Sequence, residues 1–160
     1  MNEKVVKLLN EQIGKEFYSA YLYLGMSKYF SVNGLNGFAK WYKVQAEEEQ
    51  EHAMKIYDYL LDKGYDPELN ALDAVSSDYK DVLEVVTAAD NHEKYITKSI
   101  NDIYKVAFEE QDFAAMLFLN WFITEQEEEE RNSSEMINKV KRVTKEGSLY
   151  LLDKELAERK

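Results

Sequence analysis

Four glutamates interrupt four rows of otherwise largely apolar residues in this chain. Inward-facing positions of a helical bundle recur at alternating steps of three and four residues, and the sequence contains four such rows. The third row is apolar from Val82 to Ala107 except at a single carboxylate. None of the rows contains a lysine or an arginine, so a buried ion pair would need a partner from another helix face. The glutamates that interrupt the rows are Glu16, Glu49, Glu93 and Glu129.

Carboxylates in a shared apolar core need a chemical explanation, because each loses hydration worth several kcal/mol and repels the others. In a metal-free state, the carboxylates could avoid this cost by binding protons with a raised pKa. Two divalent cations explain the pattern better, because they would neutralise all four charges. His52 follows Glu49 by three residues on the same helical face and would add an imidazole ligand. Carboxylates and imidazole without sulfur suit Fe or Mn better than copper.

The elements that must position these residues are long helices. The chain of 160 residues has one proline, six glycines and 45% hydrophobic residues, which is typical of uninterrupted helices. We therefore expect an all-α four-helix bundle in a single domain over residues 1–160. The expected helices span roughly 4–33, 36–63, 79–110 and 113–141, with a short fifth helix at 147–157.

The connections between the expected helices decide where the glutamates meet. Short breaks at Gly34 and Gly37 and around Asp112 make neighbouring helices antiparallel. The segment 64–78 is longer and ends in Ser-Ser-Asp, residues 76–78, which is suited to capping the third helix. About 15 extended residues reach roughly 50 Å, enough to cross a bundle of ~42 Å helices and leave the second and third helices parallel. Counted from these breaks, all four glutamates lie at nearly the same level.

The charge and the termini exclude several classes of partner. A net charge of −11 argues against nucleic acid, because a phosphate backbone would be repelled. There is no cysteine, so thiolate ligation is excluded. The first residues, MNEKVVKLLNEQ, lack the apolar core of a signal peptide, and no window of 18 apolar residues occurs. We expect a cytoplasmic protein that binds neither membranes nor nucleic acid.

The sequence resembles a prokaryotic non-haem ferritin over essentially its whole length. The stretches that carry the resemblance are LLNEQIGKEFYSAYLY, AEEEQEHAMKIYDYL, NHEKYITKSI, FLNWFITEQEEEE and SLYLLDKELA. The resemblance implies a ferritin-like bundle with one long crossover loop, assembled with identical copies into a 24-subunit shell. It also implies a ferroxidase, which oxidises Fe(II) with O₂ or peroxide and stores the iron as a ferric mineral inside the shell.

The same resemblance assigns roles to the core residues. It implies a first iron held by Glu16, Glu49 and His52. Glu49 would bridge to a second iron, which Glu93 and Glu129 would also hold. The centre is then a di-iron carboxylate site, of which the Glu-x-x-His unit is a recurring part.

Residues beside the second iron distinguish this chain from related families. A haem-binding bacterioferritin would carry a methionine after the bridging glutamate and a second Glu-x-x-His on the fourth helix, where this chain has Gln50 and Gln126-x-x-Glu129. No haem is therefore expected. With an imidazole on only one side of the pair and Gln126 beside the second iron, that iron should bind more loosely and pass through. Tyr23 would be a hydrogen-bonding and electron-donating neighbour, and Trp121 a nearby aromatic.

Two further groups of residues allow more than one interpretation. Glu48, Glu125 and Glu128 resemble a third iron site on the cavity side of the pair, although acidic runs are more often solvated helix faces. His92 points roughly 100° away from the core row, which predicts a surface position. The stretch 17–30, FYSAYLYLGMSKYF, is apolar almost all round and predicts contact with another subunit.

Other functions remain open at this stage. A di-iron carboxylate oxidase acting on another, organic substrate would need a substrate cavity in the same bundle. A cation buffer without redox activity would use the same ligands. A purely structural acidic bundle would explain the helices but would not explain carboxylates without cationic partners in the core.

Overall fold

The computed structural model describes residues 1–143 and 146–160, and within them every regular element is helical. The expected all-α architecture is confirmed, and each helix boundary lies within three residues of its predicted position. The helices are α1 (Glu3–Val32), α2 (Asn36–Asp62), α3 (Val82–Glu109), α4 (Phe113–Arg142) and α5 (Glu146–Leu156).

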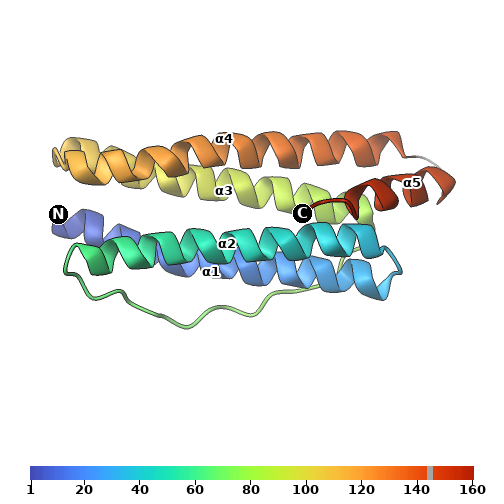
Figure 1. Ribbon diagram of the computed structural model, residues 1–160, viewed down its shortest axis with the longest axis horizontal. Helices are drawn as coiled ribbons and strands as arrows, with labels where there is room; N and C mark the ends of the chain where they lie inside the picture. Colours follow the sequence, from blue (N-terminus) through green and yellow to red (C-terminus); the bar gives the residue numbers. More distant parts are fainter. Residues whose placement is uncertain (144–145) are drawn as a thin grey trace.

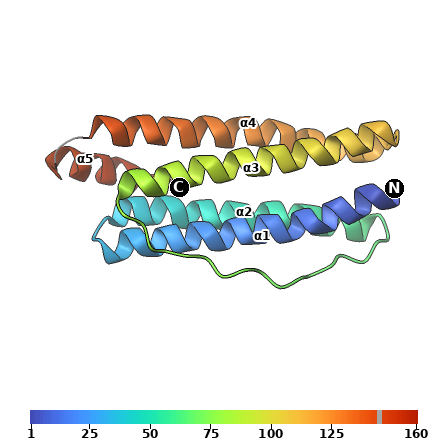
Figure 2. The ribbon, with the colours of Figure 1, turned by 180° about the vertical axis from the view of Figure 1, so that it is seen from behind.

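The bundle consists of two antiparallel hairpins joined by one long connection. Figure 1 shows α1 beside α2 and α3 beside α4, with the segment between α2 and α3 running along the outside for the length of the bundle. Figure 2 shows the same crossover from behind. As predicted, α2 and α3 run in the same direction. The short α5 lies across the end of the bundle where α4 ends and α2 begins.

Among the described residues, three helix ends use a residue in the left-handed region of backbone conformation. Gly34 has φ of 75°, Gly64 has 79° and Gln111 has 54°. At each end the following N–H donates to the carbonyl five residues earlier, which satisfies a carbonyl that the helix leaves open. These bonds are Leu35 N to Phe30 O (2.9 Å), Tyr65 N to Leu60 O (2.9 Å) and Asp112 N to Ala107 O (2.8 Å).

The start of α3 differs from the prediction. The helix begins at Val82, three residues later than expected, because Asp81 is its N-cap: its Oδ1 accepts from the Glu84 N–H at 2.8 Å. The Ser-Ser-Asp segment does not cap the helix. Instead, the Asp78 N–H donates to Ser76 Oγ at 3.2 Å within the crossover.

Gly37 also has a different role from the predicted one. It lies inside α2, where a Cβ would come within 1.6 Å of the Asp153 carbonyl oxygen on α5. The absence of a side chain therefore lets α5 pack against the start of α2. Leu35 provides no side-chain cap for α2, and Asp153 Oδ1 accepts from the Phe38 N–H at 2.9 Å. A residue of α5, which is far from α2 in the sequence, thus provides the N-terminal cap of α2.

The hydrophobic core has two parts separated by a polar layer. One apolar cluster contains Phe30 and Phe38, whose rings stack with centroids 4.7 Å apart, and the other contains Ile56 and Ile100. The layer between them holds the interruptions in the inward rows. No helix in the described part of the chain is long and apolar enough to cross a membrane.

Candidate metal centre

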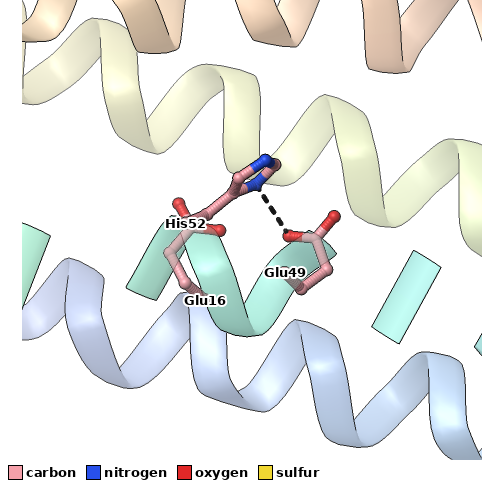
Figure 3. Close-up of side chains that lie close together, drawn as sticks. All are labelled: Glu16, Glu49 and His52. Carbon is pink, nitrogen blue, oxygen red and sulfur yellow. Dashed lines mark ion pairs between the residues drawn. The ribbon is translucent and has the colours of Figure 1, made fainter. Parts of the chain in front are cut away.

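The four core glutamates converge in the middle of the bundle, one from each long helix. Their exposed fractions are 1% for Glu16, 1% for Glu49, 2% for Glu93 and 5% for Glu129. His52 is 5% exposed and lies one turn beyond Glu49 on α2. Figure 3 shows Glu16 on α1 and Glu49 and His52 on α2 with their side chains close together between the helices.

The ligand atoms form two groups that share one glutamate. One group contains Glu16, Glu49 and His52, and its ligand atoms all lie within 4.8 Å of one another. A second group, with the same spacing, contains Glu49, Glu93 and Glu129. The arrangement offers two adjacent cation sites with Glu49 between them.

One carboxylate oxygen of the first group lacks a hydrogen-bond partner. Gln12 Nε2 donates to Glu16 Oε1 at 2.8 Å, and His52 Nδ1 lies 3.4 Å from Glu49 Oε2. Glu16 Oε2 is buried and has no hydrogen-bond partner among the described residues. A buried carboxylate oxygen without a partner is costly. With oxygen donors and one imidazole around it, this atom fits a hard or borderline divalent cation.

Uncharged donors hold the second group. The Tyr23 hydroxyl and Gln126 Nε2 both donate to the Glu93 carboxylate, the latter at 3.1 Å. Gln45 Nε2 donates to Glu49 Oε1 at 3.0 Å and to Glu129 Oε2 at 2.9 Å. Within the described chain, no lysine or arginine forms an ion pair with any of the four core glutamates. The neutral donors therefore orient the carboxylates, and no cationic side chain neutralises them.

Burial and mutual repulsion raise the pKa of all four carboxyls. Burial, and then the nearby Glu49, raise the pKa of Glu16 to about 8. Burial also raises the pKa of Glu93 to about 7, although the hydrogen bonds from Tyr23 and Gln126 oppose this shift. Burial and then Glu93 raise the pKa of Glu129 to about 8, and the same two causes raise that of Glu49 well above its ordinary value. Without metal, the centre therefore retains protons near neutral pH, and a cation would displace them.

The predicted outer acidic residues are only partly brought together. Glu125 Oε1 lies 3.7 Å from His52 Nε2, and Glu125 forms a third group of possible ligands with His52 and Glu129. Burial raises the pKa of Glu125, and the nearby Glu128 and Glu48 raise it further. Glu128 is exposed, whereas Glu48 forms an ion pair with Arg159, with Nη2 and Oε2 2.6 Å apart.

The surface position predicted for His92 is only partly correct. The side chain is partly buried against α1, with Nε2 2.7 Å from Ser19 Oγ, and burial lowers the pKa of His92 to about 4. The residue does face away from the core row, and that direction leads to α1, where His92 borders a groove between α1 and the crossover. Trp121 lies where expected, with its ring centroid 5.3 Å from that of His52.

Three polar residues around the centre were not predicted as site residues. Gln12 and Gln45 hydrogen-bond the core carboxylates, and Arg159 hydrogen-bonds Gln45. A sequence signal for the two glutamines exists, because each lies four residues before a core glutamate on the same helical face: Gln12 before Glu16, and Gln45 before Glu49. No comparable signal identifies Arg159.

The cavity that borders the second group is small. It is lined by residues that include Tyr23, Trp41, Gln45, Glu93 and Glu129, and its volume is about 20 Å³. A space of this size holds about one water molecule. An organic substrate would not fit between these side chains without rearrangement of the bundle.

Comparisons with known proteins agree with this geometry. The sequence profile of the ferritin-like domain matches residues 6–143. A probable bacterial non-heme ferritin-like protein of Haemophilus influenzae is 41% identical, covering 98% of this chain and 95% of its own. A bacterial non-heme ferritin of Campylobacter jejuni is 38% identical, covering 96% and 92%. In the crystal structure of an open pore ferritin from Archaeoglobus fulgidus, a chain with 39% identity superposes with a TM-score of 0.98 over 100% of this chain and 99% of that one.

Proposed function

The chain belongs to the ferritin family, and from this premise we propose that it is an iron-storage subunit with ferroxidase activity. The observation that carries the proposal is the pair of ligand groups joined by Glu49, buried in the bundle without a cationic side chain. Carboxylates arranged in this way without a lysine or arginine beside them favour binding of two divalent cations. The family suggests that Fe(II) is the substrate.

We assign the ligands by group. Glu16, Glu49 and His52 bind one Fe(II), and Glu49 is shared with the other Fe(II), which Glu93 and Glu129 bind. The partnerless Glu16 Oε2 supports the first assignment. Both irons are substrates that enter reduced and leave oxidised, and no haem is involved.

The reaction balances with two irons for each oxidant molecule. Two Fe(II) ions supply two electrons, which together with two protons reduce O₂ to H₂O₂ or reduce H₂O₂ to two waters. The carboxylates contribute by binding the more highly charged Fe(III) after the electrons have left. Protons displaced from Glu16, Glu93 and Glu129 on metal binding are released before this step, since the pKa values of these groups are raised.

The second half of the centre holds its iron more loosely. Gln126 places an amide beside Glu93, where a second histidine or carboxylate would have added a strong ligand. Tyr23 is 1% exposed and donates to the same carboxylate, which supports its role as a hydrogen-bonding neighbour and as a possible electron donor to the oxidant. Loose binding here suits iron that is passed on to a mineral.

A third iron binds outside the pair at Glu48, Glu125 and Glu128 in this proposal. The short distance from Glu125 to His52 supports a position next to the first iron. The proximity of Glu48 and Glu128 to Glu125 supports their joint action. Glu48 must leave its ion pair with Arg159 to take part.

Storage requires an enclosed space, so we propose that the subunits form a closed shell of 24 copies. An apolar groove of about 320 Å³ between α1 and α2, lined by Phe17, Tyr21 and Leu24 among others, supports a contact with a second copy. The cytoplasmic location stays a prediction.

An oxidase that acts on an organic substrate is the second candidate function. It would use the same ligands but needs room for its substrate beside them. The cavity of about 20 Å³ next to Glu93 and Glu129 favours iron and O₂ or peroxide as the reactants.

The direct test is aerobic addition of Fe(II), followed by oxygen uptake, ferric absorbance and particle size. We expect a fast phase that oxidises two Fe(II) per subunit and then growth of a soluble ferric core. Glu49→Ala and His52→Ala should slow the fast phase at least about tenfold, because even the loss of a residue that only hydrogen-bonds a metal ligand typically costs this much.

Glu51→Ala is the matched control, because Glu51 lies between these two ligands on α2 but is exposed. It should behave as the wild type. A fast phase that survives in Glu49→Ala would show that the assigned site is wrong, and oxidation without a soluble core would argue against storage.

A further inference from the structure

The side chain of Arg159 folds back from the segment after α5 onto α2 and is only 14% exposed. Its Nη1 donates to the Trp41 carbonyl oxygen at 3.1 Å, and Nη1 and Nη2 both donate to Gln45 Oε1 at 3.1 Å. Nη2 also donates to Glu48 Oε2 at 2.6 Å. The guanidinium carbon lies 4.2 Å from the centroid of the Trp41 ring. An arginine with this many partners in a partly buried place is firmly docked.

Docking of Arg159 determines which way the Gln45 amide points. A guanidinium can only donate hydrogen bonds, so the Gln45 atom that faces it must be the carbonyl oxygen. The NH₂ group then faces inward, where it donates to Glu49 and to Glu129. If the amide rotated by half a turn, its NH₂ group would face the guanidinium, which has no atom that can accept a hydrogen bond. Arg159 therefore acts on both ligand groups of the metal centre through Gln45.

The same guanidinium neutralises Glu48. That carboxylate lies on the outer side of the centre and its negative charge acts on Glu125 and Glu129. A cation that uses Glu48 as a ligand must first separate it from Arg159. The guanidinium and an outer metal ion thus compete for one carboxylate.

We propose that Arg159 sets the order in which cations load, by supporting the inner pair through Gln45 and withholding Glu48 from the outer site. This inference rests on the proposed function, since it requires the pair and the outer site. Arg159 is a positioning residue, because it acts through Gln45 and Glu48 and contacts none of the bound cations itself. Because coupling between sites is reciprocal, a cation captured by Glu48 also loosens Gln45 at the pair, which favours transfer of iron out of the centre.

The test is a calorimetric titration of the assembled, metal-free protein with Zn²⁺, which binds oxygen and imidazole ligands without redox chemistry. In Arg159→Gln, the affinity for the third ion should rise at least about fivefold, a usual size for coupling between sites, and the affinity for the first two should fall. A variant that is merely less well folded would lose affinity at both sites. Changes of opposite sign are therefore specific to the proposed role.

Lys160→Gln is the matched control, because it removes the same charge from an exposed side chain one residue away. It should leave both affinities as in the wild type. Adding Glu48→Gln to Arg159→Gln should abolish the gain at the outer site and retain the loss at the pair. Equal affinities in Arg159→Gln and Lys160→Gln, or changes of the same sign at both sites, would overturn this inference but leave the proposed function standing. A wild type that binds fewer than two Zn²⁺ per subunit would overturn the proposed function as well.

Discussion

Glutamine amides and a tyrosine hydroxyl hold the core glutamates, and these donors orient the carboxylates without cancelling their charge. Gln12 shows the same logic as Gln45: its Oε1 accepts from Ser99 Oγ at 2.6 Å, which turns its NH₂ group toward Glu16. Lys15 Nζ in turn donates to Ser99 Oγ at 2.7 Å. The positive charge of Arg159 thus stays one side chain away from the core glutamates, and that of Lys15 stays two side chains away. A lysine or arginine in direct contact would compete with the metal for the carboxylates.

The raised pKa values predict how the stability of the metal-free protein depends on pH. Between the ordinary pKa of 4.5 and the raised values of about 7 to 8, the folded protein binds protons that the unfolded chain has released. The free energy of unfolding must therefore fall as pH rises through this window. We expect the Tm of the metal-free protein to decrease from pH 5.5 to pH 8, and the gain in Tm on adding Zn²⁺ to be larger at pH 8.

Glu16→Gln provides the check on this pH dependence. It removes one titrating group and keeps a similar shape, so the metal-free variant should have a higher Tm at pH 8 and a weaker dependence on pH. For a chain of this size, Tm shifts by roughly 2–4 °C for each kcal/mol gained. Scanning calorimetry of both proteins at several pH values measures the effect. A Tm that is independent of pH in the wild type would contradict the interpretation of the core as proton-retaining.

At the scale of elements, α5 links the end of the chain to the start of α2. Leu152 and Leu156 are buried in one apolar cluster, Asp153 caps α2, and Arg159 lies three residues after the end of this helix. The contact depends on the lack of a side chain at Gly37. A short helix at the end of the bundle therefore positions the Arg159 guanidinium, which acts on the metal centre in the middle of the bundle.

Gly37→Ala should displace α5 from α2, because its Cβ would meet the Asp153 carbonyl at 1.6 Å. Overpacking of this kind costs about 1–3 kcal/mol. We expect a lower Tm, faster proteolysis around α5 and, because Arg159 leaves with α5, the same stronger binding of a third Zn²⁺ as in Arg159→Gln.

Gly14→Ala is the control for the Gly37 substitution. Nothing lies within 4 Å of a Cβ at Gly14, which is also in a helix, so alanine there should stabilise the protein by roughly 0.5–1 kcal/mol. If Gly37→Ala were as stable as Gly14→Ala, α5 would not depend on this close approach.

At the scale of the whole molecule, the chain exposes an apolar face that one copy alone does not cover. Tyr21 is 49% exposed and Leu24 is 48% exposed on α1, and both border the groove that reaches Leu72 in the crossover. Exposed apolar patches of this kind commonly mark protein interfaces. This face fits a second copy of the chain, consistent with the apolar sequence of residues 17–30.

Leu24→Glu should therefore weaken assembly, since it would bury a charge without a partner at the contact between copies. We expect smaller particles by light scattering coupled to gel filtration, with retained helical content by circular dichroism. Asn101→Glu adds the same charge at an exposed site on α3 and should leave the particle size unchanged. Particles of wild-type size from Leu24→Glu would exclude this face as an interface.

The sequence by itself determined the helices and the level at which the glutamates meet. Helix number, the inward rows and the parallel arrangement of α2 and α3 follow from local patterns: apolar periodicity, glycine-containing turns and the length of the crossover. Because every helix rises by a constant amount per residue, counting from the turns was enough to align Glu16 with Glu49 and Glu93 with Glu129. The convergence of the four glutamates could therefore be predicted from these counts, whereas their division into two groups that share Glu49 came from the family resemblance.

Only the tertiary structure decided what surrounds those ligands. Arg159 lies 114 residues from Gln45 in the chain, and Asp153 lies 115 residues from Phe38, so no local pattern connects them. The surface position predicted for His92 was only partly correct, because its direction from the helix axis is a local property, whereas its burial depends on the neighbouring helix. The docking of Arg159, and with it the orientation of Gln45 and the pairing of Glu48, depends on how α5 packs across the bundle. Contacts between distant segments are set by that packing and not by the residues next to them in sequence.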